Sequence, residues 1–357
     1  MDADGDKEAI DGSQGKRSSD SVDSRQGLQG LVSGLTTERS IDSVAPLFSF
    51  GVITDVQYAD IPDGASFLGT PRFYRHALEV LNRAVANWNQ LGRVIFAIHF
   101  GDLVDGLSKD ESHVAFDKVL AGFNAFHGGS VYHMIGNHCL YNLPRVELNQ
   151  LLKIPPSPDE RSYYEFSPYP GFRFVVLDGY DISVLGWPEE HPKAQMAIRL
   201  LDKINPNEDK NSPIGLKGDM ARFVKFNGGL GNDQLSWLDH VLHTASLANE
   251  KTIVCCHLPL HPATLESPSA LCWNYVDVLV TLQKYSCVVA CLSGHAHTGG
   301  YTIDSHGIHY VVLEAVLECP PEEDAFGVID VFPDRLSLAG RGRMTSRDMY
   351  FRQESSI

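Results

Sequence analysis

The sequence predicts an α/β fold in which several strands end at one edge of the structure and present polar side chains there. Short apolar runs typical of buried strands alternate with segments in which apolar residues recur every three or four positions, as in helices. Five of the apolar runs stop abruptly and are followed by Asp, Asn or His. Because strand ends along one sheet edge converge in space, we expect these five loops to surround a single site.

The first strand is predicted over Leu47–Ile53 and leads into Thr54–Gln57. A helix is then expected from Pro71 to about Gln90, because Pro suits a first helical turn and apolar residues line one face. Further strands are predicted at 93–100, 131–135, 163–166, 172–177, 252–256 and 288–293. Further helices are predicted at 111–123, 194–204 and 233–247, the last capped by Asn232. Closing strands at 308–312, 326–331 and 336–338 should be antiparallel, because their connections are short.

The composition divides the chain of 357 residues into three parts. Residues 1–45 contain no aromatic side chain and are rich in Asp, Ser and Gly, which predicts a disordered leader. Residues 46–345 are predicted to form one catalytic domain, in which a polar, Gly-rich insertion at about 180–231 lies over the site. Residues 346–357 are expected to be a C-terminal tail.

Charge and cysteine content narrow the possible partners. The net charge of −16 argues against nucleic acid as a partner, although bound cations would still allow a small phosphorylated substrate. No apolar run is long enough to span a membrane, and the N-terminus lacks the pattern of a secretory signal. The seven cysteines include no C-x-x-C pair and suit reduced thiols. We therefore expect a cytoplasmic monomer that acts on a small molecule, with no membrane partner.

The side chains at the strand ends are suitable ligands for divalent cations. They are Asp55, Gln57, Asp102, Asn137, His257, His295 and His297. This set offers carboxylate, amide and imidazole donors but no thiolate, which favours Mn²⁺ or Fe²⁺ over a closed structural zinc site. One ion does not need seven donors, and a pair of ions would clamp the attacking and leaving oxygens of a phosphoryl transfer. Taken singly, a His after a strand, or Asn137 in a turn, has ordinary structural explanations.

The ordered series Asp-x-Gln, Gly-Asp-x-x-Asp, Gly-Asn-His, His and Gly-His-x-His resembles the calcineurin-like metallophosphoesterases over roughly residues 47–340. The resemblance implies a four-layer α/β/β/α sandwich of two mixed β-sheets. It also implies that Asp102 bridges two ions, and that His138 protonates or hydrogen-bonds the leaving oxygen. The remaining ligands would be Asp55, Gln57 and His297 for one ion, and Asn137, His257 and His295 for the other.

Segments 55–60, 73–76, 138–142 and 257–262 resemble one branch of that family, the manganese-dependent ADP-ribose/CDP-alcohol diphosphatases. The branch implies hydrolysis of ADP-ribose to AMP and ribose 5-phosphate, and of CDP-choline or CDP-glycerol to CMP and a phosphoalcohol. Gln57 stands where most of the family has His, which favours Mn²⁺ over Zn²⁺, with Mg²⁺, Fe²⁺ and Zn²⁺ all kept as alternatives. Cys139 stands where an acidic residue usually follows Gly-Asn-His, which bears on the tuning of His138.

Substrate contacts are expected from three further residues. Phe67 can pack against a base or ribose, Arg72 can reach a phosphate, and the small Cys272 can leave room for a nucleobase. Phe67 can equally anchor its loop, and Arg72 can simply be solvated. Two other functions stay open at this stage: a broader phosphodiesterase or phosphomonoesterase using the same site, and a metal-degenerate scaffold that binds proteins.

Overall fold

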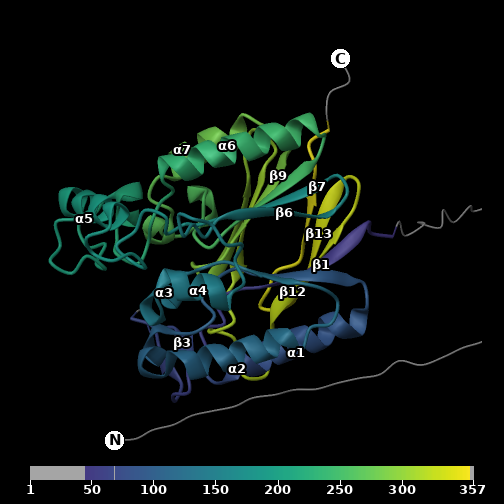
Figure 1. Ribbon diagram of the computed structural model, residues 1–357. Helices are drawn as coiled ribbons and strands as arrows, with labels where there is room; N and C mark the ends of the chain where they lie inside the picture. Colours follow the sequence, from purple (N-terminus) through teal and green to yellow (C-terminus); the bar gives the residue numbers. More distant parts are fainter. Residues whose placement is uncertain (1–44, 68, 354–357) are drawn as a thin grey trace, which may run out of the picture. The chain divides into compact units, whose positions relative to one another are not determined.

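The computed structural model describes residues 45–67 and 69–353, so the predicted leader lies outside the described residues except for Ala45. Two six-stranded sheets face each other, and helices cover the outer side of each (Figure 1). This arrangement confirms the predicted four-layer α/β/β/α sandwich. Among the residues that the structure describes, no helix combines the length and apolar character needed to cross a membrane.

The first sheet has the strand order β14-β13-β12-β1-β4-β5. Strands β1 (Phe48–Ile53), β4 (Val94–His99) and β5 (Val131–His133) run parallel to one another. Helices α1 (His76–Leu91) and α2 (Ser112–Asn124) lie on the outer side of this sheet (Figure 1). Three antiparallel strands complete it: β12 (Ala325–Val331), β13 (Arg335–Gly342) and β14 (Arg347–Tyr350).

The second sheet has the order β10-β11-β9-β8-β7-β6. Its parallel strands are β7 (Phe172–Leu177), β8 (Lys251–Cys256), β9 (Val288–Ser293) and β11 (His309–Glu314). The antiparallel edge strands are β6 (Tyr164–Tyr169) and β10 (Thr298–Ile303). Helices α6 (Asn232–Leu247) and α7 (Tyr275–Gln283) cover its outer side (Figure 1).

Aromatic side chains fill the space between the two sheets. The ring of Phe50 on β1 stacks on that of Phe96 on β4, with centroids 5.0 Å apart. Both rings meet the edge of Phe174 on β7, at 5.2 and 5.3 Å. Burying each such side chain contributes roughly 1.5–3 kcal/mol, and the edge-to-face contacts add to this. The core therefore holds the two sheets in a fixed relation and aligns their carboxyl ends.

Two predicted helix starts are wrong. Pro71 and Arg72 form strand β3, which pairs with β2 (Gly64–Ala65), and α1 begins only at His76. The backbone N–H of Phe73 donates to the carbonyl of Leu317, which holds this segment extended. Helix α6 includes Asn232, so Gly231 occupies the cap position.

In the first sheet β12 and β13 pair antiparallel, as predicted. In the second sheet β11 is antiparallel to β10 but parallel to β9. The hairpin partner of β11 is β10, which sequence patterns missed because it contains two glycines and is largely exposed. Strand β14 lies within the segment predicted as a tail, because Leu336 on β13 pairs with Met349 and buries it.

The insertion at about 180–231 belongs to the same compact unit as the rest of the chain from residue 45. It carries α5 (Pro192–Ile204), close to the predicted helix, and extends to one side of the second sheet (Figure 1). Its two ends are joined by paired hydrogen bonds between Ile182 and Gly229. Two short helices, α3 (Asn137–Asn142) and α4 (Arg145–Leu151), follow β5.

Candidate metal centre

All seven predicted ligands follow the carboxyl ends of parallel strands, six in loops and Asn137 at the first residue of α3. Three loops belong to the first sheet, after β1, β4 and β5, and two belong to the second, after β8 and β9. One candidate ligand atom from each of Asp102, His257 and His295 lies within 4.8 Å of the other two. On the other side, Nε2 of His297 lies 3.5 Å from Oδ1 of Asp55 and 2.9 Å from Nε2 of Gln57. The structure therefore brings the predicted set into one centre.

The backbone is strained at this centre. Five of the seven ligands have φ between 41° and 68°, in the left-handed region that side chains other than glycine rarely adopt: Asp55, Gln57, Asp102, His295 and His297. Each such conformation costs on the order of 1 kcal/mol and persists only where the surrounding structure enforces it. The loops thus turn back sharply after their strands, which aims successive side chains inward.

Glycines in two of the motifs permit the close approach of these loops. A Cβ at Gly136 would lie 2.1 Å from Oδ1 of Asp102. A Cβ at Gly294 would lie 2.1 Å from the hydroxyl of Thr54 and 2.6 Å from Oδ2 of Asp55. No real side chain tolerates such distances, so these glycines let one loop lie directly against the carboxylate of the next.

Each aspartate accepts hydrogen bonds from backbone or hydroxyl donors through one oxygen, and Oδ1 of Asp55 also accepts from Nε2 of Gln57 at 3.3 Å. Oδ2 of Asp55 accepts hydrogen bonds from the Thr54 hydroxyl and from the backbone N–H of His295. Oδ1 of Asp102 accepts from the backbone N–H of His138 at 2.8 Å. Burial would raise both carboxyl pKa values, but neighbouring histidines hold the pKa of each below its usual range. Both groups are therefore ionised, as metal ligands must be.

Each of the three histidines likewise contacts a residue outside the predicted ligand set through one of its ring nitrogens. His257 donates from Nδ1 to the carbonyl of Phe100 at 2.6 Å. His297 donates from Nδ1 to Oε1 of Glu318 at 2.9 Å. Nε2 of His295 lies 2.8 Å from Oδ1 of Asn227. Outer partners of this kind fix the orientation of a metal-binding imidazole and leave its second nitrogen for the ion.

The inward-facing atoms fit divalent cations. Oε1 of Gln57 is buried and has no hydrogen-bond partner, and Oδ2 of Asp102 and Nε2 of His257 are buried and face each other at 3.2 Å. Leaving a buried polar atom unpaired costs about 1–3 kcal/mol, and a cation coordinated by these atoms would offset that cost. The donors are carboxylate, amide and imidazole with no thiolate, a set that suits Mn²⁺.

His138 stands beside the metal ligands and is oriented by a residue that the sequence analysis did not assign. The backbone N–H of Gly106 donates to Nδ1 of His138 at 3.0 Å, so Nε2 carries the proton of the neutral ring. Oδ2 of Asp105 lies 3.2 Å from the same Nδ1 and has no hydrogen-bond partner. Asp105 is therefore placed to accept a hydrogen bond from Nδ1 when His138 is protonated. The thiol of Cys139 is fully buried, and burial raises its pKa to about 12.

A cavity of about 400 Å³ opens onto this centre, a size typical of small-molecule sites. Its wall contains Phe67, whose side chain is fully exposed, together with Arg72 and Phe226. The prediction for Cys272 is not supported, because this thiol is buried in the core and does not line the cavity. It packs there because its backbone N–H donates to the carbonyl of Pro259.

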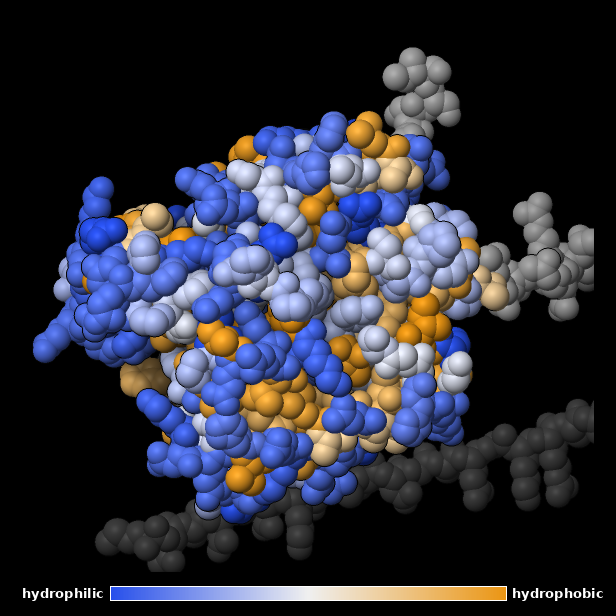
Figure 2. All heavy atoms as spheres, viewed as in Figure 1, coloured by the Kyte–Doolittle hydropathy of each residue, from blue (hydrophilic) through white to orange (hydrophobic). Residues whose placement is uncertain are grey.

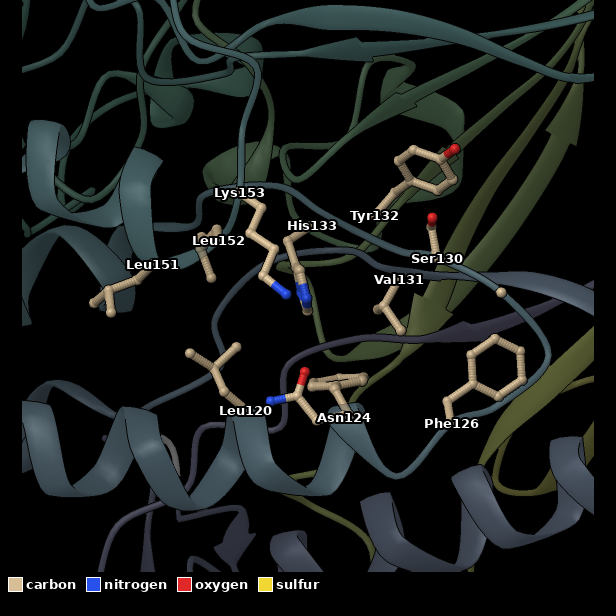
Figure 3. A pocket seen from close by; sticks show the side chains of 12 residues that line it. Leu120, Asn124, Phe126, Ser130, Val131, Tyr132, His133, Leu151, Leu152 and Lys153 are labelled. Atoms are coloured by element: carbon tan, nitrogen blue, oxygen red, sulfur yellow. The ribbon is translucent and has the colours of Figure 1, made fainter.

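Another cavity, of about 310 Å³, lies beside the edge strand β5 and is lined partly by α2. In Figure 3 the side chains of Lys153 and His133 point toward each other near the middle of the lining residues, between Leu151 on one side and Phe126 on the other. Hydrophobic side chains gather between α2 and α4 on the face shown in Figure 2, where this cavity opens. It contains none of the predicted ligands, so the strand-end cavity is the candidate active site.

The family described as calcineurin-like phosphoesterase matches the chain over residues 48–299. The chain belongs to this family. Among curated relatives, the manganese-dependent ADP-ribose/CDP-alcohol diphosphatase of Oryza sativa subsp. japonica is 56% identical over 307 residues, which span 86% of this chain and 95% of the relative. The human protein of the same name is 39% identical over 333 residues, which span 88% of this chain and 96% of the relative. A solved dimetal phosphatase from Danio rerio superposes with a TM-score of 0.83 at 40% identity, covering 86% of this chain and all of that one.

Sequence reasoning missed several outer residues of this calcineurin-like phosphoesterase centre. Asp105 closes the Gly-Asp-x-x-Asp motif, and that position could have identified it. Tyr180 donates its hydroxyl to Oδ1 of Asn137 at 3.1 Å, but nothing in the sequence around it signals this contact. Glu318 and Asn227 likewise lie outside every recognised motif, 21 and 68 residues from their histidine partners.

Proposed function

We propose that the chain is a manganese-dependent hydrolase that cleaves the diphosphate linkage of ADP-ribose and of CDP-alcohols such as CDP-choline and CDP-glycerol. The observation that carries this proposal is the convergence of carboxylate, amide and imidazole donors from five strand ends at one cavity, whose wall includes Gln57, Asp102, Asn137, His295 and His297. Relatives that align over nearly their whole length carry the name of this activity. The products would be AMP and ribose 5-phosphate, or CMP and a phosphoalcohol.

When bound, two divalent cations would supply Lewis acidity for the phosphoryl group and for the attacking water. Asp102 would be the ligand shared by the two ions; its Oδ2 is buried and lies 3.2 Å from Nε2 of His257. Asp55, Gln57 and His297 would complete one ion's set, and Asn137, His257 and His295 would complete the other. The fixed backbone of these loops holds the donors in place before substrate arrives.

His138 serves the leaving group in this proposal. Its Nε2–H would donate a hydrogen bond to the leaving oxygen; the backbone N–H of Gly106 donates to Nδ1 of the neutral ring, and Asp105 would accept from Nδ1 when the ring is protonated. Changing Asp105 to Asn should reduce turnover about a hundredfold and leave metal content unchanged. Metal content measured together with kcat distinguishes this role from damage to the ligand set.

Arg72 and two aromatic rings would position the substrate. Nε of Arg72 is buried without a hydrogen-bond partner, although the residue lines the cavity, so a phosphate oxygen can accept from it. Phe67 on one wall and Phe226 on another offer flat surfaces against which a nucleobase can stack. Changing Phe67 to Ala should raise KM for the nucleotide substrates more than it lowers kcat.

We further propose that the protein acts in the cytoplasm as a monomer, without a nucleic-acid or membrane partner. All seven cysteines are free and buried in the described structure, which suits a reducing compartment. The strongly negative net charge disfavours contact with a phosphate backbone.

A substrate panel tests the activity. ADP-ribose, CDP-choline, a cyclic nucleotide and an aryl phosphate would be compared with added Mn²⁺, and Asp102→Ala serves as the inactive control. We expect ADP-ribose and CDP-choline to be the preferred substrates. Preference for the cyclic nucleotide or the aryl phosphate would favour a broader esterase, and failure to turn over any of the four would overturn both enzyme assignments.

A further inference from the structure

The insertion reaches the metal centre at Asn227. This side chain is completely buried, and its Oδ1 lies 2.8 Å from Nε2 of His295. The neighbouring Phe226 lines the active-site cavity, and its ring centroid lies 5.9 Å from that of His295. A single turn of the insertion therefore touches both the metal centre and the cavity in front of it.

The other contacts of Asn227 determine which ring nitrogen of His295 carries the proton. Nδ2 of Asn227 lies 2.9 Å from the carbonyl of Arg222 and 2.6 Å from the carbonyl of Ser269. Carbonyl oxygens only accept hydrogen bonds, so the amide must present its NH₂ group to them. The remaining atom, Oδ1, is an acceptor, and Nε2 of His295 must donate to it. Nδ1 of His295 then carries the lone pair.

We propose that Asn227 is a positioning residue for the second ion: it holds His295 in the Nε2–H tautomer and at the ring angle that presents Nδ1 to the metal. The insertion thereby contributes to metal affinity as well as covering the site. This inference rests on the proposed two-ion centre and is independent of which substrate the enzyme uses.

Two separate sets of contacts hold Asn227, one to its backbone and one to its side-chain amide. The hydroxyl of Ser183 donates to the backbone carbonyl of Asn227 at 3.3 Å, and the pairing of Ile182 with Gly229 closes the segment around it. With both hydrogens of Nδ2 committed to carbonyl groups, rotation of the amide would break two hydrogen bonds and set oxygen against oxygen. The tautomer of His295 is thus fixed by residues far from it in sequence.

Mn²⁺ binding to Asn227→Ala tests the proposal without reference to activity. Manganese would be titrated and followed by electron paramagnetic resonance and by elemental analysis, with Ser183→Ala as a matched control that alters the same loop but leaves the amide in place. We expect Asn227→Ala to bind one ion normally and the second 10–100-fold more weakly, because loss of an outer partner has effects of this size. Ser183→Ala should bind both ions as the wild type does. Wild-type affinity for both ions in Asn227→Ala would overturn the proposal.

A second measurement covers the case in which Asn227→Ala does not fold. Nitrogen NMR of wild-type protein labelled at histidine, in EDTA, reports the tautomer of each ring, and His295→Asn assigns the signal. We expect a single Nε2–H tautomer for His295. An Nδ1–H ring, or a mixture of the two forms, would overturn the proposal even if the centre binds metal and turns over substrate.

Discussion

His295 and His297 stand two residues apart in one motif, yet their surroundings are opposite. His297 lies between Asp55 and Glu318, and Glu318 is itself 3.6 Å from the guanidinium of Arg343. Burial would lower its pKa, but hydrogen bonds to the two carboxylates raise the pKa of His297 to about 9. His295 has the neutral amide of Asn227 as its partner, and burial lowers the pKa of His295 to about 3.

This contrast extends to the two halves of the metal centre. The half around His297 contains the carboxylates of Asp55 and Glu318. The half around His295 is built from imidazoles and the amides of Asn137 and Asn227, with Asp102 as the carboxylate that the two halves would share. Anionic surroundings favour a dication, so the first half should bind Mn²⁺ more tightly than the second. The motif Gly294–His297 thus supplies both imidazole rings. Residues distant in the sequence, such as Asp55 and Asn227, determine the charge around each ring.

The largest effect is expected from Asp102→Ala, which removes the ligand common to both halves. Activity should be abolished, and bound manganese should fall by more than one equivalent per chain. Elemental analysis after gel filtration measures the metal, and turnover of ADP-ribose measures the activity. Asp55→Ala is the matched control, because it removes a carboxylate from one half only and should leave one equivalent bound. Retention of both ions by Asp102→Ala would show that the bridge has been assigned wrongly.

The second prediction concerns the pH dependence of stability in the metal-free protein. Folded His297 holds its proton up to about pH 9, whereas the unfolded chain loses it near pH 6.5. The folded state therefore binds more protons between these values, so this stabilisation is complete below pH 6.5 and is lost as pH rises through 9. The amount is about 3 kcal/mol. Urea unfolding in EDTA across this range measures it, and His297→Asn should flatten the curve.

His295 should change the pH dependence of stability in the opposite direction. Its folded pKa of about 3 lies below the unfolded value of 6.5, so stability that is present above pH 6.5 is lost as pH falls toward 3. His295→Asn should remove this acid-side loss and leave the alkaline side unchanged. If His295→Asn and His297→Asn gave the same dependence of stability on pH, the two histidines would not lie in the opposite charge environments described above.

The parts of the centre that were predictable from sequence are those encoded in short motifs. Strand-end residues such as Asp55 and Asn137 could be identified from the sequence. An apolar run followed by turn-forming residues predicts a buried strand that ends at the edge of the sheet where the site lies. Asn227 and Glu318 could not be identified, because each acts through a contact across a large sequence separation. Cys272 was misassigned for the same reason, since only packing shows that its thiol enters the core.

Glu318→Gln tests the charged partner of His297. The amide keeps the size of the side chain but removes its charge, so the first ion should bind 10–100-fold more weakly while the second is little changed. Calorimetric titration with Mn²⁺ resolves the two affinities. Asn227→Ala should have the opposite effect: it should weaken binding of the second ion and leave binding of the first unchanged. If both variants weaken the same ion, the division of the centre into two halves is incorrect.

The smallest effect is expected from Gln57→His, which changes the identity of one donor in the first half. Oε1 of Gln57 is buried without a partner, and an amide oxygen is a harder ligand than imidazole. The His variant should bind metal several-fold more tightly and relax the requirement for Mn²⁺, with the largest gain for Zn²⁺. Gln57→Glu is the control, because it adds charge while keeping an oxygen donor, so it should tighten binding without extending activity to Zn²⁺. Activity measured across Mn²⁺, Mg²⁺ and Zn²⁺ distinguishes the two, and an unchanged metal profile in Gln57→His would count against Gln57 as a ligand.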